Sequence, residues 1–215
     1  MIKPVLRATR NREQILDAAR LVLIRDGYER ITTRRIAEEA GVNIATLHYY
    51  FGTKEDLLTQ TMRYTQKWVH DRLLSSVEGA TTFDEMMRRI FATMWELVRD
   101  QPGLLRFDLA VRGFRDETAR CQAEEMFQNN LLMAEQMIHC QLVVTGVVLS
   151  GDLTATRIAH YFVSAVDGLL LNYCITRDES STLIGLDMIR EHALSLLGIQ
   201  VSPFRSSHHS EDITP

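Results

Sequence analysis

Side chains that can contact a phosphate backbone gather between residues 33 and 54. Threonine, tyrosine, histidine, asparagine, arginine and lysine side chains donate hydrogen bonds to phosphate oxygens, and the aromatic ones also offer an apolar body to sugars and thymine methyls. The candidates of this kind are Thr33, Arg34, Asn43, Thr46, His48, Tyr49, Tyr50 and Lys54. Two aliphatic neighbours, Ile44 and Ala45, favour contact with thymine methyls over hydrogen-bonded base readout. The residue types predict a surface for double-stranded DNA.

Two short helices separated by one glycine must position these side chains. Residues 33–40 carry apolar Ile36, Ala37 and Ala40 at helical spacing. Gly41 ends this helix, because glycine adopts the left-handed conformation without a Cβ penalty. Asn43 is a favourable N-cap for a second helix of about two turns. Two helices joined by a glycine-containing turn are typical of a helix-turn-helix, which places its second helix in the major groove.

The starts of two helices offer sites for phosphate. Gly52-Thr53-Lys54 combines a threonine cap with a cation beside free backbone N–H groups, and Thr33 and Arg34 do the same at the earlier helix. The alternative is that the threonines and Asn43 are only caps and that the tyrosines are amphipathic surface residues.

Residues 9–58 resemble the DNA-binding domain of the tetracycline-repressor (TetR) family of bacterial transcription regulators. The resemblance is carried by Ile15-Leu16, Ala18-Ala19, Gly27-Tyr28, Thr32-Thr33-Arg34, Ile36-Ala37, Ala40-Gly41-Val42, Thr46-Leu47, Tyr50-Phe51, Lys54-Glu55 and Leu57. One departure is His48, where the family usually has tyrosine; an imidazole could gain charge near neutral pH. The resemblance implies a dimeric regulator of transcription with a helical effector-binding domain.

The charge is divided unevenly along the 215 residues. The whole chain has a formal net charge of -4, with 46% hydrophobic and 24% charged residues, as in an ordinary soluble protein. Residues 1–58 contain ten Lys plus Arg against eight Asp plus Glu, whereas the remainder contains fourteen against twenty. The acidic balance therefore belongs to the second domain.

The first twelve residues hold Lys3, Arg7, Arg10 and Arg12 and no acidic residue. Such an arm can follow phosphates or enter a minor groove. A solvated, partly disordered terminus is an equal alternative.

Several features predict a cytoplasmic protein with no membrane association. The N-terminus lacks the apolar run of a signal peptide, and no stretch reaches about 18 uninterrupted apolar residues. Cys121, Cys140 and Cys174 are odd in number and far apart, which fits reduced thiols better than disulfides or zinc.

The predicted fold class is all-α. We expect a three-helix helix-turn-helix domain over residues 1–58, with the helix-turn-helix at about 32–51, a larger ligand-binding and dimerisation domain over 59–201, and a disordered tail over 202–215. A long helix from Lys54 to about Val77 connects the two domains and is the natural lever between them.

The helix through Met126 is apolar on more than one side, which predicts that it lies buried at the centre of the second domain. Methionines adapt to irregular shapes, and a buried Asn130 in a methionine stripe would need a partner, which a ligand could provide. The candidate ligand-binding residues on this helix are Met126, Asn130 and Met133. The resemblance to the TetR family adds the aromatic residues Trp68, Phe91, Trp95 and Phe107, which lie on helices that surround the effector cavity in that family. Ordinary core packing is the alternative for each of them.

The last two helices carry more apolar surface than one small domain readily buries, and a homodimer would cover it. The expected interface residues are Ile158, Phe162, Ala165, Leu169, Tyr173, Met188, Ile189 and Leu196. Two recognition helices would then address half-sites about 34 to 36 Å apart on a pseudo-palindromic operator.

No pattern in the sequence indicates an enzyme. The sequence contains no Cys-x-x-Cys, no glycine-rich phosphate loop and no Gly-x-Ser-x-Gly motif, so we predict no catalytic residue, metal or cofactor. The function that the resemblance to the TetR family implies is a repressor released from its operator by a small apolar or amphipathic effector. The alternatives are a ligand-dependent activator and a helical adaptor that binds proteins without operator binding.

Overall fold

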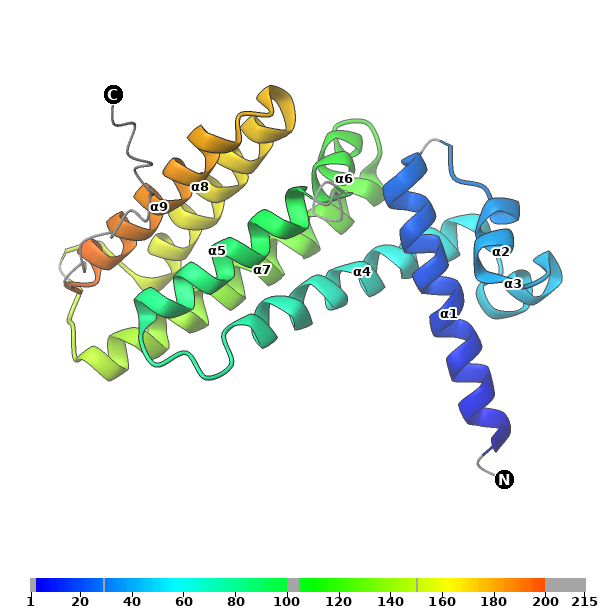
Figure 1. The fold of residues 1–215 in the computed structure, drawn as a ribbon, viewed down its shortest axis with the longest axis horizontal. Helices are drawn as coiled ribbons and strands as arrows, with labels where there is room; N and C mark the ends of the chain where they lie inside the picture. The colour runs from blue at the N-terminus through cyan, green and yellow to red at the C-terminus, as the bar shows by residue number, and fades with distance from the viewer. Residues whose placement is uncertain (1–2, 29, 100–104, 150, 200–215) are drawn as a thin grey trace, which may run out of the picture.

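The computed structural model describes residues 3–28, 30–99, 105–149 and 151–199, and only the backbone at residues 3–10, 105, 106 and 145. These residues form α-helices joined by short turns, which confirms the all-α prediction (Figure 1). The helices are α1 (Lys3–Asp26), α2 (Thr33–Ala40), α3 (Ile44–Phe51), α4 (Lys54–Ser76), α5 (Phe83–Arg99), α6 (Leu105–Gly113), α7 (Glu117–Thr145), α8 (Ala155–Thr176) and α9 (Glu179–Leu196). The predicted tail, 202–215, lies outside the described residues.

Helices α1, α2 and α3 pack around one small core together with the start of α4. The caps are those that the sequence predicts: Thr32 accepts a hydrogen bond from the backbone N–H of Arg35, and Gly41 adopts a left-handed φ of 64° after α2. The side chains of Ile36, Leu47 and Leu57 are fully buried in this core. The short helices are therefore fixed by caps and by a shared apolar centre.

Helix α4 runs from this small domain into the larger one (Figure 1). The predicted boundary after residue 58 falls inside α4, so the helix belongs to both parts. The guanidinium of Arg20 in α1 stacks on the ring of Trp68 at 4.6 Å, which ties the middle of α4 to the N-terminal domain.

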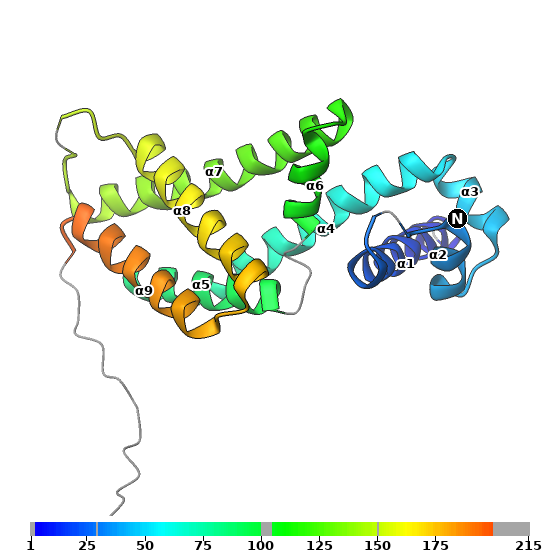
Figure 2. The ribbon, with the colours of Figure 1, turned by 90° about the horizontal axis from the view of Figure 1, so that it is seen from above.

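The larger domain packs α5, α7, α8 and α9 together, and α4 enters it along one side next to α5 (Figure 1 and Figure 2). Its interior consists of two apolar clusters, one around Phe83, Phe162 and Leu194 and the other around Trp95 and Leu170. At the start of α5, Thr82 accepts from the N–H of Glu85. The carboxylate of Glu85 accepts in turn from the backbone of Thr81, which is the main cause of its lowered pKa.

The prediction that the helix through Met126 lies buried at the centre of the domain is wrong. Of the described side chains of α7, only Ala119 and Ile138 are fully buried, and Leu132 is 54% exposed. Helix α7 lies along one side of the domain, where it packs against α6 and α8 (Figure 2). Its apolar side chains contact α6 and α8 and line a cavity, and the helix is not surrounded by others.

The core of the small domain extends into the larger one. Leu109 of α6 and Ala119 of α7 are buried in the same cluster as Ile15 and Leu47. The guanidinium of Arg112 also lies 3.2 Å from the ring centroid of Tyr28, at the end of α1. The two domains therefore meet across an apolar contact and not through α4 alone.

A buried arginine joins α9 to α5. Arg190 is only 1% exposed, and its guanidinium bonds the carboxylate of Asp84 and lies 2.7 Å from that of Asp187. Burial alone would lower its pKa, but the hydrogen bonds with these two carboxylates outweigh burial and raise it. This network was not anticipated from the sequence.

Helix α8 is long and apolar enough, by length and composition, to cross a membrane, although the sequence predicted no such segment. Only 33% of its most apolar window is buried within the protomer. The side chains left exposed include the large apolar ones of Tyr161, Leu171 and Ile175.

Candidate nucleic-acid interface and internal cavity

Helix α3 presents its polar side outward. Leu47 and Phe51 are buried, whereas Tyr49 is 83% exposed and Ile44 is 38% exposed. Ala45 and His48 are also exposed, and Thr46 and Tyr50 are half-buried. The edge of the Tyr50 ring contacts Tyr49, with centroids 5.2 Å apart. The helix therefore has a rigid apolar base and a solvent-facing surface of the predicted residue types.

Asn43 acts as a helix cap in the structure. Its Oδ1 accepts hydrogen bonds from the backbone N–H of Thr46 at 2.7 Å and from the Thr46 hydroxyl at 2.9 Å. Both side chains are thus held in place by one another. The amide nitrogen of Asn43 remains available for an external contact.

His48 closes the other end of α3. Its Nδ1 lies 2.7 Å from the carbonyl oxygen of Gly52, which can only accept, so Nδ1 carries the hydrogen. The N–H of Gly52 donates back to the carbonyl of His48 at 2.9 Å. This reciprocal pair fixes the imidazole and leaves Nε2 for a contact outside the protein.

The starts of α2 and α4 bring two cations beside α3. Arg34 is exposed and Lys54 half-buried, and neither has an ion-pair partner among the described residues. Thr33 is half-buried beside Arg34. At the start of α4, Asp56 occupies part of the predicted phosphate clamp, since its carboxylate accepts from the Thr53 hydroxyl at 2.7 Å. We therefore expect Lys54, and not the free N–H groups alone, to attract phosphate there.

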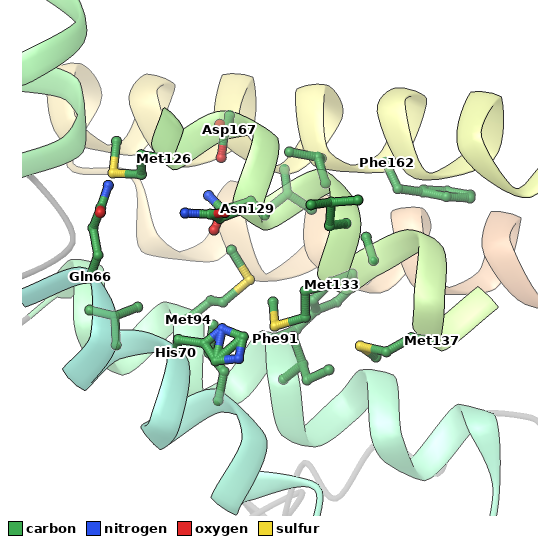
Figure 3. A pocket seen from close by; sticks show the side chains of 18 of the residues that line it. Gln66, His70, Phe91, Met94, Met126, Asn129, Met133, Met137, Phe162 and Asp167 are labelled. Atoms are coloured by element: carbon green, nitrogen blue, oxygen red, sulfur yellow. The ribbon is translucent and has the colours of Figure 1, made fainter. Parts of the chain in front are cut away.

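A cavity of about 580 Å³ opens inside the larger domain. It is lined from α4, α5, α7, α8 and α9, and Figure 3 shows methionine, aromatic and carboxamide side chains pointing into it. This volume lies within the usual range of small-molecule sites. The cavity is the strongest candidate for an effector site.

Four of the seven predicted ligand-binding residues lie on the cavity wall: Phe91, Met126, Asn130 and Met133. The other three do not. Trp68 faces away, between Arg20 and Arg72. Trp95 packs edge-on against Tyr173 with ring centroids 4.6 Å apart, and Phe107 packs against the same cluster. Core packing, the alternative for each candidate, thus holds for Trp95 and Phe107, whereas Trp68 lies between two arginines outside the core clusters.

Sequence reasoning missed much of the wall, notably Met62, Gln66, His70, Met94, Asn129 and Met137. A signal was present in the spacing. Residues 125, 129, 132 and 136, which are polar except for Leu132, recur at helical intervals beside a second stripe formed by residues 126, 130, 133 and 137. The two adjacent stripes, one mostly polar and one mostly methionine, mark the side of α7 that faces the cavity.

The predicted dimer surface is only partly on the outside. Ile158, Phe162 and Tyr173 are buried within the protomer, and the first two line the cavity, so the prediction is wrong for these three. Their positions on α8 face α5 and α9 because the helix turns one apolar stripe inward. Ala165, Leu169, Ile189 and Leu196 are half-buried, and Met188 is 66% exposed.

A different apolar set covers the outer side of α8 and α9. Its large members are Tyr161, Leu171, Ile175, Leu183, Ile184 and Met188. Gly185 allows the two helices to approach, because a Cβ there would lie 2.8 Å from the side chain of Leu169. We call this set the outer α8–α9 face.

Residues 15–61 match the family described as bacterial regulatory proteins, tetR family. This segment is the small domain with α3 at its surface. The chain carries the DNA-binding domain of the TetR family. It is a DNA-binding regulator of transcription, and TetR-family regulators bind operator DNA as dimers.

Full-length relatives and solved structures agree with this TetR-family assignment. The chain is 24% identical to the HTH-type transcriptional regulator BetI of Brucella canis over 196 residues, covering 87% of this chain and 92% of that protein. It is 27% identical to BetI of Rhizobium meliloti over 185 residues, covering 84% and 88%.

Among solved structures, a TetR-family regulator from Cytophaga hutchinsonii matches with a TM-score of 0.70 at 18% identity, covering 92% of this chain and 98% of that one. The regulator FadR of Bacillus subtilis, in complex with stearoyl-CoA, matches with a TM-score of 0.66 at 18% identity, covering 86% and 98%. At this identity the structures show a shared fold.

Proposed function

We propose that this TetR-family protein is a cytoplasmic repressor that leaves its operator when a small molecule occupies the cavity. The observation that supports the proposal is that two residues of the cavity wall also contact the core of the DNA-binding domain. Met62 of α4 is 6% exposed and belongs to the core of the DNA-binding domain, and it also lines the cavity. Met126 of α7 packs against that core and lines the cavity as well.

A ligand that displaces these two methionines must shift the packing of the DNA-binding domain. Interiors are close-packed, so a moved side chain is felt by its neighbours. Polar links across α4 and α7 would move with them: Gln122 donates to Thr59 at 3.1 Å, and Arg63 lies 3.7 Å from Glu125. The expected result is a change in the angle of α4 and hence in the position of α3.

DNA contacts are assigned in this proposal by exposure and chemistry. Arg34 and Lys54 would bind phosphates, together with the hydroxyls of Thr33, Tyr49 and Tyr50. The exposed side chains of Ile44 and Ala45 would contact bases, with Thr46, Asn43 and the Nε2 of His48 beside them.

The operator-binding form is proposed to be a homodimer joined through the outer α8–α9 face. This face is apolar, and its exposure in the protomer is what a two-fold interface would cover. Two copies of α3 would then read half-sites of a pseudo-palindrome.

The test begins with selection of double-stranded DNA from a random pool, which should yield a pseudo-palindromic site. A library of small apolar molecules is then screened for thermal stabilisation of the protein, and each hit is titrated against operator binding. Linkage requires that a hit that weakens operator affinity by a given factor is itself bound more weakly, by the same factor, in the presence of operator. Equal operator affinity with the cavity filled and empty would contradict the proposal, and increased affinity would favour the activator alternative.

A further inference from the structure

The exposed side chains that line the cavity all belong to two helices. Arg63, Lys67 and His70 come from α4, and Glu125, Asn129, Leu132 and Gln136 come from α7. The mouth of the cavity therefore lies between α4 and α7. All of these residues except Leu132 are polar.

The floor of the cavity is apolar. Its buried lining residues come from every wall, α4 included, and apart from Thr65 they carry hydrocarbon or thioether side chains. They include Leu73, Phe83, Met87, Ile90, Phe162 and Leu197. In Figure 3, Phe162 and Met137 lie at the opposite end from Gln66 and Asn129. A molecule that fills the cavity must therefore have one polar end and an apolar body.

The charged side chains around the cavity are already engaged. Arg63 lies 3.7 Å from Glu125 across the mouth, and the ammonium of Lys67 lies 2.6 Å from the carboxylate of Asp71. Asp167 of α8 points to the same end of the cavity as Asn129 and has a partner of its own (Figure 3). Each of these side chains thus already has a partner, and among the described residues the imidazole of His70 is the one titratable group on the cavity wall for which no ion pair is found.

The polar groups that remain are mainly carboxamides. No hydrogen bond to another described residue engages Gln66, Asn129, Asn130 or Gln136, and each offers N–H donors and a carbonyl acceptor. Neutral dipoles of this kind satisfy an uncharged polar group, whereas a full charge beside an apolar floor would lose hydration without a counter-ion.

We propose that the cavity selects a lipophilic molecule with an uncharged hydrogen-bonding head, such as a long-chain alcohol or a neutral ester. The head lies between α4 and α7 against Gln66, Asn129 and Asn130, and the chain extends toward Phe162 and Met137. This inference rests on the proposed function, since it describes the effector of the same site. It also separates this protein from the similar FadR structure, whose ligand, stearoyl-CoA, bears phosphates that need cations.

Three probes with the same ten-carbon chain test the ligand class: 1-decanol, decanoate and decyltrimethylammonium. Isothermal titration of the full-length protein should give a Kd for decanol at least about tenfold lower than for either ion. Tighter binding of decanoate or of the ammonium ion, or binding of none of the three, would overturn the inference.

A pair of variants tests where the head lies. Asn130→Leu should weaken decanol binding about three- to tenfold through loss of a hydrogen bond. Gln128→Leu is the matched control, because Gln128 is exposed on the same helix and does not line the cavity. Unchanged decanol affinity in Asn130→Leu, or an equal loss in the control, would contradict the placement. Decanol that binds as expected but leaves operator affinity unchanged would contradict the repressor proposal and not the ligand class.

Discussion

The two regions joined by α4 differ in how their interiors are filled. The DNA-binding domain has one continuous core in which Leu47 and Leu57 are fully buried. The larger domain divides its core into two clusters with a cavity of about 580 Å³ beside them. A filled core gives α3 one fixed position, and a hollow one leaves helices free to repack when a ligand enters. The difference in packing therefore suits the small domain to binding DNA and the larger domain to responding to a ligand.

The largest expected effect is in the larger domain. Arg190→Ala should lower the free energy of unfolding by about 3–5 kcal/mol, because Asp187 would lose its buried cation and Asp84 would keep only the more exposed Arg88. Chemical denaturation measures it. Arg157→Ala is the control, since Arg157 is 64% exposed and its loss should change stability by no more than about 0.5 kcal/mol. An equal loss of stability in the two variants would show that the buried Arg190 network contributes no more than a surface ion pair.

The next prediction concerns the outer α8–α9 face. Ile184 is 59% exposed, and Ile184→Glu should weaken the dimer roughly a hundredfold, or about 2.7 kcal/mol, by placing charges in an apolar interface. Sedimentation equilibrium measures the change, and affinity for a palindromic site should fall with it. Val148→Glu, at a position 90% exposed in the loop between α7 and α8, should leave the dimer intact. A dimer that tolerates Ile184→Glu would place the interface elsewhere.

A smaller effect is expected in the DNA-binding domain. Gly52 has φ 71° and ψ −102°, where L residues are strained, so Gly52→Ala should cost about 1–3 kcal/mol and tilt α3 relative to α4. Thermal unfolding and operator affinity should both decrease. Gly168→Ala is the comparison, because Gly168 is helical and a Cβ there meets no atom within 4 Å. Equal stability of the two variants would contradict backbone strain at position 52 in Gly52→Ala.

The smallest effect concerns one cation. Lys54→Ala should weaken binding to all DNA sequences alike and reduce the slope of log K against log salt by about 0.9, since one phosphate contact is lost. Ile44→Ala should instead alter which sequences are preferred. Fluorescence anisotropy over a salt series separates the two. A sequence-dependent effect of Lys54→Ala would assign it to base readout.

Local signals in the sequence predicted the DNA-binding domain well. The bounds of α2 and α3 follow from Thr32, Gly41 and Asn43, because caps and a left-handed glycine act within one turn of the chain. The helical nature of the rest follows equally from its periodicity. His48 shows the limit of such reasoning: its type was noted as a departure, but its bond to Gly52 depends on the turn between α3 and α4.

The second domain was predicted less well, for a physical reason. An apolar stripe predicts that one side of a helix is buried, but it does not indicate whether the core, a ligand or a second protomer covers that side. Phe162 was assigned to the dimer and lines the cavity, while Trp95 was assigned to the cavity and packs in the core.

The sequence by itself determined an all-α chain and a helix-turn-helix with an outward α3. Only the tertiary structure decided which apolar surfaces meet each other, which line the cavity and which remain exposed. It also paired Arg190 with Asp84, which lies 106 residues away in the chain. Caps and periodicity are local properties of the chain, whereas these choices depend on how nine described helices pack against one another.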